Sequence, residues 1–348
     1  MRVGVYIEPI IQQQAGIHQF TVQLANALAA FGQHQYVLIG SKSINSTLEQ
    51  IVVSRAGVSL LHVSRWMTKD LITEHRLDCF IDPSHFGSLG LLPAKHRIAI
   101  VHDITPLLFP RFHRWRTYLS QRVLMKSWIE RSKHTIAISH QTESDIRTHL
   151  QPRAKITHIY PGVNISKETT DFVSRSKRYM LSVGTAEPRK NIYRVIEAFE
   201  GIEHPDFDLV IVGPKGWKMN LQKRVANSRR SSQIKLLGFV DRNKLEALYQ
   251  KALALIYPSL YEGFGFPIVE AMLHGCPVIT SDLSAMKEVA SESAFLVNPY
   301  DVVSIQNAMF SLSQNSELRS NFCEKGKDRA KAFTWSGFVS RLESEVLA

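Results

Sequence analysis

Short apolar runs alternate with longer amphipathic stretches along almost the whole chain. In the first half, strands are predicted near residues 3–7, 36–39, 79–81, 97–101, 135–138 and 156–160, with a helix at 17–31 after the first strand. In the second half, strands are predicted near residues 178–184, 209–212, 233–237, 252–257, 277–280 and 294–297, and helices lie between or after them. This alternation favours parallel, doubly wound α/β sheets, which bind ligands beyond the carboxyl ends of their strands.

A chain of 348 residues is long for one core and suits two domains of ordinary size. Pro161 and Gly162, with the polar run 165–177 that follows, provide turn residues and no apolar period. We place the interdomain linker there. The sequence therefore predicts two Rossmann-like domains, 1–165 and 166–333.

The composition is that of an ordinary globular protein, with 44% hydrophobic and 21% charged residues. No segment is apolar enough to span a bilayer, and residues 1–7 have the pattern of a core strand and not of a signal peptide. We expect a cytoplasmic protein. The three cysteines, Cys79, Cys276 and Cys323, are far apart and lack metal-ligand spacing, so neither structural disulfides nor a zinc site are expected.

Positive charge is concentrated in the first half. Residues 1–165 carry 18 Lys and Arg against 10 Asp and Glu, whereas residues 166–348 carry 24 against 21, which gives +8 and +3 of the total +11. A basic surface attracts nucleic acid or an anionic membrane. The composition alone does not choose between them.

The stretch from Tyr257 to Asp282 contains a strand, a glycine turn at 263–265, a helix opened by Pro267 and a second strand. Free backbone N–H groups and the positive end of a helix dipole suit a phosphate at such a turn. Glu262 precedes the turn and Glu270 lies in the predicted first turn of the helix, so we expect them to serve different groups of one ligand. The alternative is that Glu270 only complements the helix dipole and Glu262 is a solvated loop charge.

A second loop, residues 185–191, follows a strand and enters a helix. Arg189 and Lys190 stand at that predicted helix start, where the dipole favours acids, so a bound anion would explain them. The alternative is that Glu187 pairs with these cations at the surface.

Both stretches resemble signatures of one family. The residues from Glu262 to Glu270 resemble the glutamate-x7-glutamate signature of the retaining, nucleotide-sugar-dependent glycosyltransferases of family four, and residues 187–191 resemble the Glu-Pro-Arg-Lys-Asn element of the same family. The resemblance implies the GT-B fold, in which two Rossmann-like domains face each other across a cleft. It also implies that a C-terminal helix, 334–348, crosses back to the first domain.

The resemblance assigns roles around a nucleotide-sugar donor. It implies that Glu262 faces the sugar hydroxyls, that Glu270 holds the ribose, and that Arg189 and Lys190 grip the diphosphate as part of the catalytic set. Further donor contacts are implied at turns, with residues 238–240 near the nucleobase: Gly16, Gly184, Gly238, Phe239, Val240, Gly263, Phe264 and Gly265. For Gly16 the alternative is a turn glycine at a helix cap.

A histidine follows the strand 97–101. His102 and Asp103 resemble the Val-His-Asp element of the family, which implies that His102 is catalytic, at the reacting end of the donor sugar. The alternative for His102 is a satisfied structural histidine. Asp103 is expected either to orient His102 or to touch the acceptor.

A basic stretch, 111–133, mixes seven Lys and Arg residues and one acid with aromatic and aliphatic side chains. Such a segment can rest on an anionic bilayer, and we assign Arg114, Trp115 and Arg116 to acceptor or membrane contact. The alternative is an ordinary helix with one core face and one solvated basic face. Because family members often act on polyprenyl-linked acceptors, we expect a peripheral position on the inner face of the plasma membrane.

The resemblance is strongest to bacterial mannosyltransferases of surface polysaccharide assembly. It implies a hexosyltransferase that takes mannose from GDP-mannose, with UDP-sugars left open, and passes it with retention to a glycan or polyprenyl-linked acceptor. Neither a metal nor a cofactor is expected, and nucleic acid is not an expected partner. The alternatives are a nucleotide-sugar epimerase on a GT-B-like frame and a non-catalytic protein that binds nucleotide sugar.

Overall fold

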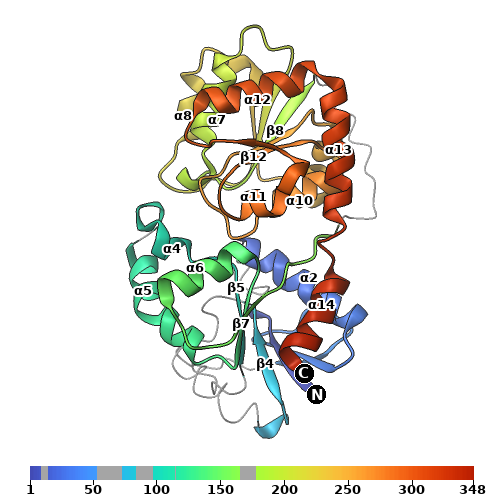
Figure 1. Cartoon of the computed structure of the whole chain (residues 1–348). Coiled ribbons are helices and arrows are strands. Elements are labelled where there is room, and N and C mark those ends of the chain that lie inside the picture. The colour runs from blue at the N-terminus through green and yellow to red at the C-terminus, as the bar shows by residue number, and fades with distance from the viewer. Residues whose placement is uncertain (9–14, 53–72, 84–96, 114, 165–177) are drawn as a thin grey trace. The chain divides into compact units, whose positions relative to one another are not determined.

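The computed structural model describes residues 1–8, 15–52, 73–83, 97–113, 115–164 and 178–348. The chain divides into two compact units, each with its own sheet and core (Figure 1). Unit 1 comprises Met1–Gly162 together with Thr334–Ala348, and unit 2 comprises Val163–Phe333. The sequence predicted the end of the first domain at residue 165, three residues beyond Gly162. The predicted linker, residues 165–177, lies outside the described residues.

Unit 1 contains a seven-stranded parallel sheet in the order β3-β2-β1-β4-β5-β6-β7. Its three adjacent strands β4, β5 and β6 are buried along their whole length, and β1 and β2 are buried except at their first residue, as expected for a parallel sheet covered on both faces. The strands are β1 (Arg2–Tyr6), β2 (Gln35–Gly40), β3 (Glu49–Val52), β4 (Cys79–Asp82), β5 (Arg97–Val101), β6 (His134–Ala137) and β7 (Ile156–His158). The sequence did not predict β3, because this partly exposed edge strand has no apolar run.

The helices that the structure describes in unit 1 cover this sheet. They are α2 (Ala15–Phe31), α4 (Thr105–Leu108), the 3-10 turn Pro110–Phe112, α5 (Trp115–Glu130), α6 (His140–Leu150) and α14 (Trp335–Arg341), which continues as a π-helical segment, Leu342–Leu347. The fully buried Arg97 joins β5 to α5: its guanidinium lies 5.1 Å from the centre of the Trp128 ring and donates to the Trp128 carbonyl and to Ser132 Oγ.

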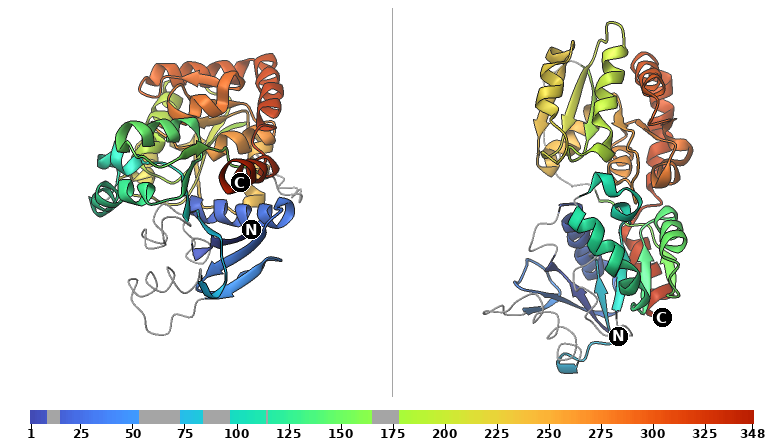
Figure 2. Two further views of the ribbon diagram at one scale, coloured as in Figure 1. Left: turned by 60° about the horizontal axis from the view of Figure 1, so that its bottom comes forward. Right: turned by 90° about the vertical axis from the view of Figure 1, so that its left-hand side faces the viewer.

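The C-terminal segment completes the core of unit 1. Helix α14 lies beside α2 (Figures 1 and 2). The ring of Phe20 is 5.4 Å from that of Trp335 and 6.2 Å from that of Phe338, and Trp335 Nε1 donates to Gln23 Oε1 at 2.9 Å. Residues more than 300 positions apart in the chain therefore form one hydrophobic cluster.

Unit 2 contains a six-stranded parallel sheet in the order β10-β9-β8-β11-β12-β13. Its strands are β8 (Tyr179–Val183), β9 (Asp208–Val212), β10 (Ile234–Gly238), β11 (Leu255–Tyr257), β12 (Val278–Ser281) and β13 (Phe295–Val297). The chain runs outward from β8 to β9 and β10, and then returns to the other side of β8 to form β11. The strand order therefore reverses between β8 and β11, which is where ligands bind in doubly wound sheets.

Seven α-helices belong to the described part of unit 2. They are α7 (Ile192–Gly201), α8 (Leu221–Ala226), α9 (Arg242–Lys251), α10 (Phe266–Leu273), α11 (Ser284–Ala290), α12 (Val302–Gln314) and α13 (Ser316–Ala330), with 3-10 turns at Pro188–Lys190, Ser231–Gln233 and Ser291–Ser293. Helices α7 and α12 pack together over the apolar side chains of β8, β9 and β11, and α10 packs against α13 (Figure 1). Asp241 caps α9 by accepting from the Lys244 amide.

The three cysteines are free thiols, with Cys79 and Cys276 buried and Cys323 partly exposed. Among the described residues, no helix combines the length and the apolar character needed to cross a membrane.

Two glycines allow the loops after β8 and β9 to approach each other closely. Gly184 has a φ of +150° and Gly213 a φ of +148°. A Cβ atom on Gly213 would lie 1.9 Å from the carbonyl oxygen of Gly184. The loop that leaves β8 therefore rests on a neighbouring backbone, and only glycine fits at position 213.

We expect Gly213→Ala to lower the stability of the protein by about 2–4 kcal/mol, because the new Cβ combines an unfavourable φ with a steric clash. In a unit of this size, such a loss corresponds to a fall of about 5–10 °C in the thermal midpoint. Differential scanning calorimetry of both proteins measures it. Gly16→Ala is the control, because a Cβ there meets nothing within 4 Å; an unchanged midpoint for Gly213→Ala would refute the packing argument.

Candidate active site

The loops that follow β8 and β11 lie side by side at the strand-order reversal of unit 2. The β8 loop contains the turn Pro188–Lys190, and the β11 loop runs from Pro258 to Gly265 before α10 begins. Both stretches that the sequence singled out therefore reach the same edge of one sheet.

A buried carboxylate joins the two loops. Glu262 Oε2 lies 2.5 Å from Arg189 Nη1, and Glu262 Oε1 lies 2.7 Å from Lys190 Nζ. Arg189 also pairs with Glu187 at 2.6 Å. All four side chains are at most 14% exposed. They form one cluster of two cations and two anions, which we call the Glu262 cluster.

The Glu262 cluster changes the interpretation of the two cations. Arg189 and Lys190 lie in the 3-10 turn Pro188–Lys190, and α7 begins only at Ile192, so the prediction that they open a helix was wrong. Their charges are already balanced by carboxylates, and no bound anion is needed to account for them. The expected alternative, pairing with Glu187, occurs for Arg189 but in a buried cluster and not at the surface. The central partner, Glu262, was not foreseen as their partner.

Asn191 fixes the geometry of the β8 loop. It has a φ of +61°, and its buried amide Nδ2 donates to the carbonyls of Pro258 and Pro299 at 3.0 and 2.7 Å. The Leu260 amide donates to the Arg189 carbonyl at 2.8 Å. Asn tolerates the left-handed conformation better than most residues and also supplies the two donors. The sequence identified this residue only as part of a motif.

Burial and charge act against each other in the Glu262 cluster. Burial alone would raise the pKa of Glu262, but the charges of Arg189 and Lys190 outweigh it and lower this pKa to about 2. Burial also lowers the pKa of Lys190, against the attraction of Glu262. Lys190 Nζ additionally lies 2.6 Å from the hydroxyl of Tyr257, a residue that the sequence analysis did not assign to the site.

Glu270 belongs to a separate group on α10. It lies in the second turn of that helix, so its predicted place in the first turn was wrong. Its Oε2 accepts from the Tyr249 hydroxyl at 3.1 Å, and its Oε1 lies 3.7 Å from Arg242. Burial raises the pKa of Glu270 and nearby Glu246 adds to this, whereas Arg242 and Tyr249 oppose it. Arg242 also pairs with Glu246 at 2.8 Å.

The start of α10 has a glycine N-cap and no side-chain cap. Gly265 occupies this position with a φ of +97°, and Pro267 lies in the first turn. The ring of Phe264 is 2% exposed and packs against Phe266 and Phe333. If Phe264 contacts a donor, it does so through its backbone. Gly263, the residue after the buried Glu262, has only backbone atoms to offer.

The loop after β10 presents an aromatic ring to solvent. Phe239 is 79% exposed, the largest exposed fraction among the large hydrophobic residues that the structure describes. It follows Gly238, whose φ is +66°, and precedes the half-buried Val240. Such an exposed ring suits stacking on a flat ligand.

The remaining predicted residues lie in unit 1. His102 follows β5 and is 9% exposed, and its Nε2 lies 2.8 Å from the Pro83 carbonyl, so this nitrogen carries the proton. The ring of Phe20 meets it edge-on at 4.6 Å. Asp103 Oδ1 accepts from the Thr105 amide at 2.9 Å. Gly16 lies within the first turn of α2 and is exposed, so it is not a turn glycine.

Helix α5 carries an exposed apolar row. Trp115, Leu119 and Val123 are spaced four residues apart and are 68%, 48% and 64% exposed, whereas Met125, Trp128 and Ile129 form its core face. Arg122 and Lys126 are exposed on the same helix. Arg114 and the side chain of Arg116 lie outside the described residues.

The depressed pKa of Glu262 predicts a stability difference that depends on pH. A carboxylate with a lowered pKa stabilises the fold above its unfolded pKa and loses this contribution as the pH falls through the folded pKa. The difference between about 2 and the usual 4.5 corresponds to about 3 kcal/mol. We therefore expect wild type to exceed Glu262→Gln by a constant margin from pH 7 to pH 5.

This margin should narrow progressively below about pH 4.5, as protons bind to the unfolded carboxylate. Thermal midpoints of both proteins at pH 7, 5, 4 and 3 measure it. A margin that stays constant down to pH 3 would contradict the assigned charge state of Glu262.

Family models match both units. The model "Glycosyltransferase Family 4" matches residues 15–167, and the model "Glycosyl transferases group 1" matches residues 166–329. The two matches meet within the predicted linker, so together they extend over most of the chain.

Curated relatives include two O-antigen chain mannosyltransferases. RfbU of Salmonella typhimurium is 35% identical over 232 residues, which cover 66% of this chain and 64% of RfbU. Mannosyltransferase B of Escherichia coli is 28% identical over 307 residues, which cover 81% of this chain and 77% of that protein. The chain spans just under two thirds of the length of RfbU, the first of these relatives.

Solved structures share the architecture of the whole chain. Sucrose-phosphate synthase from Thermosynechococcus elongatus superimposes with a TM-score of 0.81 at 18% identity, covering 98% of this chain and 97% of that one. HepE from Anabaena, in complex with UDP-glucose, gives a TM-score of 0.78 at 16% identity over 100% and 99% of the two chains. These likenesses establish the fold, which is GT-B. With this fold and matches of both family models, the chain belongs to the family 4 glycosyltransferases, the glycosyl transferases of group 1.

Proposed function

We propose that the protein transfers a hexose, with mannose favoured, from a nucleoside diphosphate sugar to a hydroxyl of a glycan or lipid-linked acceptor in surface polysaccharide synthesis, with retention of the anomeric configuration. The observation that carries this proposal is the Glu262 cluster, which holds two cations at the strand-order reversal of unit 2. The similarity to the O-antigen chain mannosyltransferases RfbU and mannosyltransferase B supports the choice of mannose.

Arg189 and Lys190 suit a donor diphosphate because their positions are fixed before a ligand binds. Cations held in place by carboxylates in a largely buried setting cost little reorganisation when charge develops on a leaving group. The backbone N–H groups at the start of α10, beginning at Gly265, add donors without adding charge. We assign the diphosphate to these groups, and the proposed transfer needs neither a metal ion nor a cofactor.

Glu262 is an ionised carboxylate at the centre of the cluster. Its oxygens accept from Arg189 Nη1 and Lys190 Nζ. Ser259 and Tyr257 are further hydrogen-bonding neighbours, so a sugar hydroxyl would replace one of these weaker neutral partners. The low pKa keeps the group ionised, and therefore an acceptor, throughout the neutral range. We assign Glu262 to positioning the sugar, and the role of His102 stays a prediction.

Glu270 and Phe239 suit the nucleoside part of the donor. Glu270 is held by Tyr249 and Arg242 on a helix face, which fits a carboxylate that accepts from ribose hydroxyls. Phe239 offers an exposed ring on which a nucleobase can stack. The sugar and the nucleoside are therefore assigned to different glutamates, because Glu262 contacts the two cations of its cluster whereas Glu270 contacts Tyr249 and Arg242.

Binding of the donor can be tested through Phe239, because removal of an exposed ring should not disturb the core. We expect GDP to bind more tightly than UDP, and Phe239→Ala to weaken binding of the preferred nucleotide by about tenfold, within the usual range of base stacking on an aromatic residue. Isothermal titration calorimetry measures both. Phe310→Ala, which removes a half-exposed ring on α12, is the matched control.

Equal binding by Phe239→Ala and wild type would remove this residue from the base site. Binding of neither nucleotide would contradict the donor site as a whole. Incubation of the protein with GDP-mannose in the absence of acceptor separates the two enzyme classes: an epimerase releases a changed nucleotide sugar, whereas a transferase does not.

The exposed row on α5 fits a membrane surface, where lipid-linked acceptors reside. Apolar side chains four residues apart, next to the exposed Arg122 and Lys126, suit the interface of an anionic bilayer. We propose that the protein is cytoplasmic and binds the inner face of the plasma membrane through this helix.

We expect the protein to sediment with vesicles that contain phosphatidylglycerol and not with pure phosphatidylcholine vesicles. Replacing Leu119 and Val123 by Ser should weaken binding about tenfold or more. Partial insertion of two aliphatic side chains into the bilayer contributes about 2 kcal/mol to the binding free energy, and the serines lose this contribution. Phe310→Ser, on an exposed face of α12, should bind like wild type. Equal sedimentation of the double variant would exclude α5 as the contact.

A further inference from the structure

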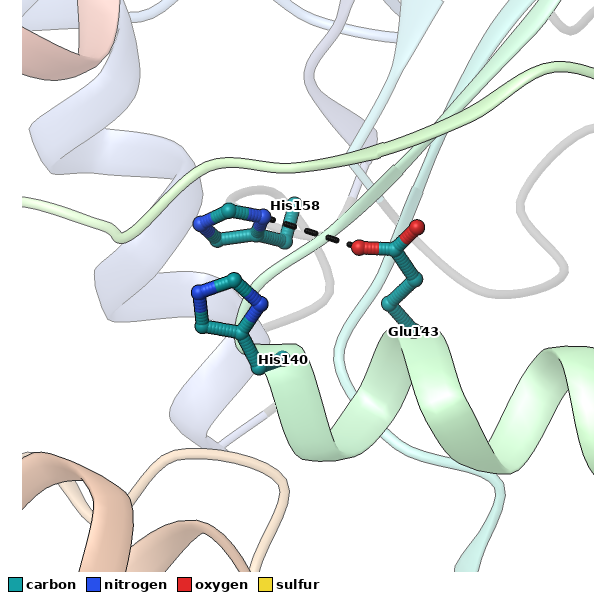
Figure 3. A group of neighbouring side chains, drawn as sticks. All are labelled: His140, Glu143 and His158. Carbon is teal, nitrogen blue, oxygen red and sulfur yellow. Dashed lines mark ion pairs between the residues drawn. The ribbon is translucent and has the colours of Figure 1, made fainter.

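Two histidines and a glutamate gather at the carboxyl edge of the sheet of unit 1. His140 is the first residue of α6, Glu143 follows one turn later, and His158 is the last residue of β7 (Figure 3). One ring nitrogen of each histidine and one carboxylate oxygen of Glu143 all lie within 4.8 Å of one another. We call these three residues the His140 cluster.

The side chains of the His140 cluster lie close together. Figure 3 shows the two imidazole rings one above the other, each with a nitrogen on the side where the Glu143 carboxylate lies. The ring centroids are 3.4 Å apart, and His158 Nδ1 is 3.5 Å from Glu143 Oε2. Three ligand atoms from two neighbouring elements therefore lie near one another, and the two rings, which are tilted by 31°, must turn apart for both nitrogens to face one ion.

These distances are close to those of a coordinated ion. Zinc ligands at about 2.0–2.2 Å in a tetrahedral arrangement are separated by roughly 3.3–3.6 Å. The His158–Glu143 distance already meets this requirement. The largest separation in the cluster must shrink by at most roughly 1.3 Å, and a rotation of the exposed His140 side chain can supply this change.

Neighbouring groups orient the carboxylate ligand. Arg147 donates twice to Glu143 Oε1, at 2.9 and 2.8 Å, and once to the Ile156 carbonyl of β7. This arrangement directs Glu143 Oε2 toward His158. Hydrogen bonds that fix a ligating carboxylate from behind are a usual feature of metal sites.

The degree of burial also suits an ion. The side chains of Glu143 and His158 are about one fifth exposed, and His140 is exposed, so an ion can enter from solvent and keep a water ligand. Two imidazoles and one carboxylate form a donor set typical of zinc and neighbouring divalent transition metals, whereas calcium and magnesium prefer oxygen ligands.

We propose that His140, Glu143 and His158 bind one divalent transition-metal ion, of which Zn²⁺ is the representative, with water completing the coordination. The ion joins the start of α6 to the end of β7. Thr142, which lies between two of the ligands in the chain, donates from Oγ1 to the His102 carbonyl at 3.3 Å. A bound ion therefore also steadies the turn that supports His102, and it takes no part in the transfer itself.

The test uses the purified full-length protein, stripped of metal with a chelator and titrated with ZnCl₂ alone by calorimetry. We expect one site per chain, with affinity at least tenfold weaker in His140→Ala, His158→Ala and Glu143→Gln. His149→Ala is the matched control, because His149 is exposed on the same helix outside the cluster. Cys323→Ser tests whether the partly exposed thiol contributes.

Replacement of Zn²⁺ by Co²⁺ adds a readout of geometry, since a tetrahedral site with nitrogen ligands gives an intense visible absorption that the three cluster variants should lose. Thermal midpoints without metal confirm that each variant is folded. Binding that is unchanged in all three cluster variants, or absent from wild type, would overturn the proposal and leave an ordinary ion pair beside two stacked rings.

Discussion

The buried carboxylate of Glu262 holds the carboxyl edge of unit 2 together. It is shared by Arg189 and Lys190, so the loop after β8 and the loop after β11 have one charge centre in common. Loss of this carboxylate leaves Arg189 paired with Glu187 but takes from Lys190 its carboxylate partner, in a setting with little access to water, which is costly. Backbone contacts reinforce the same junction, because Asn191 and the Arg189 carbonyl bind the β11 loop directly. The residues of the predicted donor site therefore also hold the loop after β8 and the loop after β11 together.

The sequence predicted the elements well wherever an apolar run marks a strand. It missed β3, whose residues Glu49–Val52 form a partly exposed edge with little apolar character. It predicted the positions of residues within a helix less well. Glu270 was predicted in the first turn of α10 but lies in the second, because this helix already begins at Phe266, directly after Gly265 with its positive φ. The GT-B fold and the family follow from motifs that are long enough to be specific, and the comparisons confirm both.

Side-chain partners over long distances could not be predicted. Arg189 and Glu262 are 73 positions apart, and no local pattern records that their strands are neighbours. Phe264 lies between two glycines of the predicted ligand-binding turn, yet its ring packs into the core, because a motif does not reveal which way a side chain points. The sequence also offered no sign of the His140 cluster. Its two histidines are 18 positions apart, at the start of a helix and at the end of a strand, and no local pattern brings them together.

The return of the last residues to unit 1 has a consequence for how the chain acquires its structure during synthesis. Unit 2 consists of one continuous segment and can fold as soon as that segment has left the ribosome. Unit 1 cannot complete its folding at that stage, because Trp335 and Phe338, which cover Phe20 on α2, have not yet been synthesised. The first half of the chain is therefore made before unit 2 but completed after it, and until residues 335–338 have been synthesised it carries an uncovered apolar surface that a chaperone could recognise.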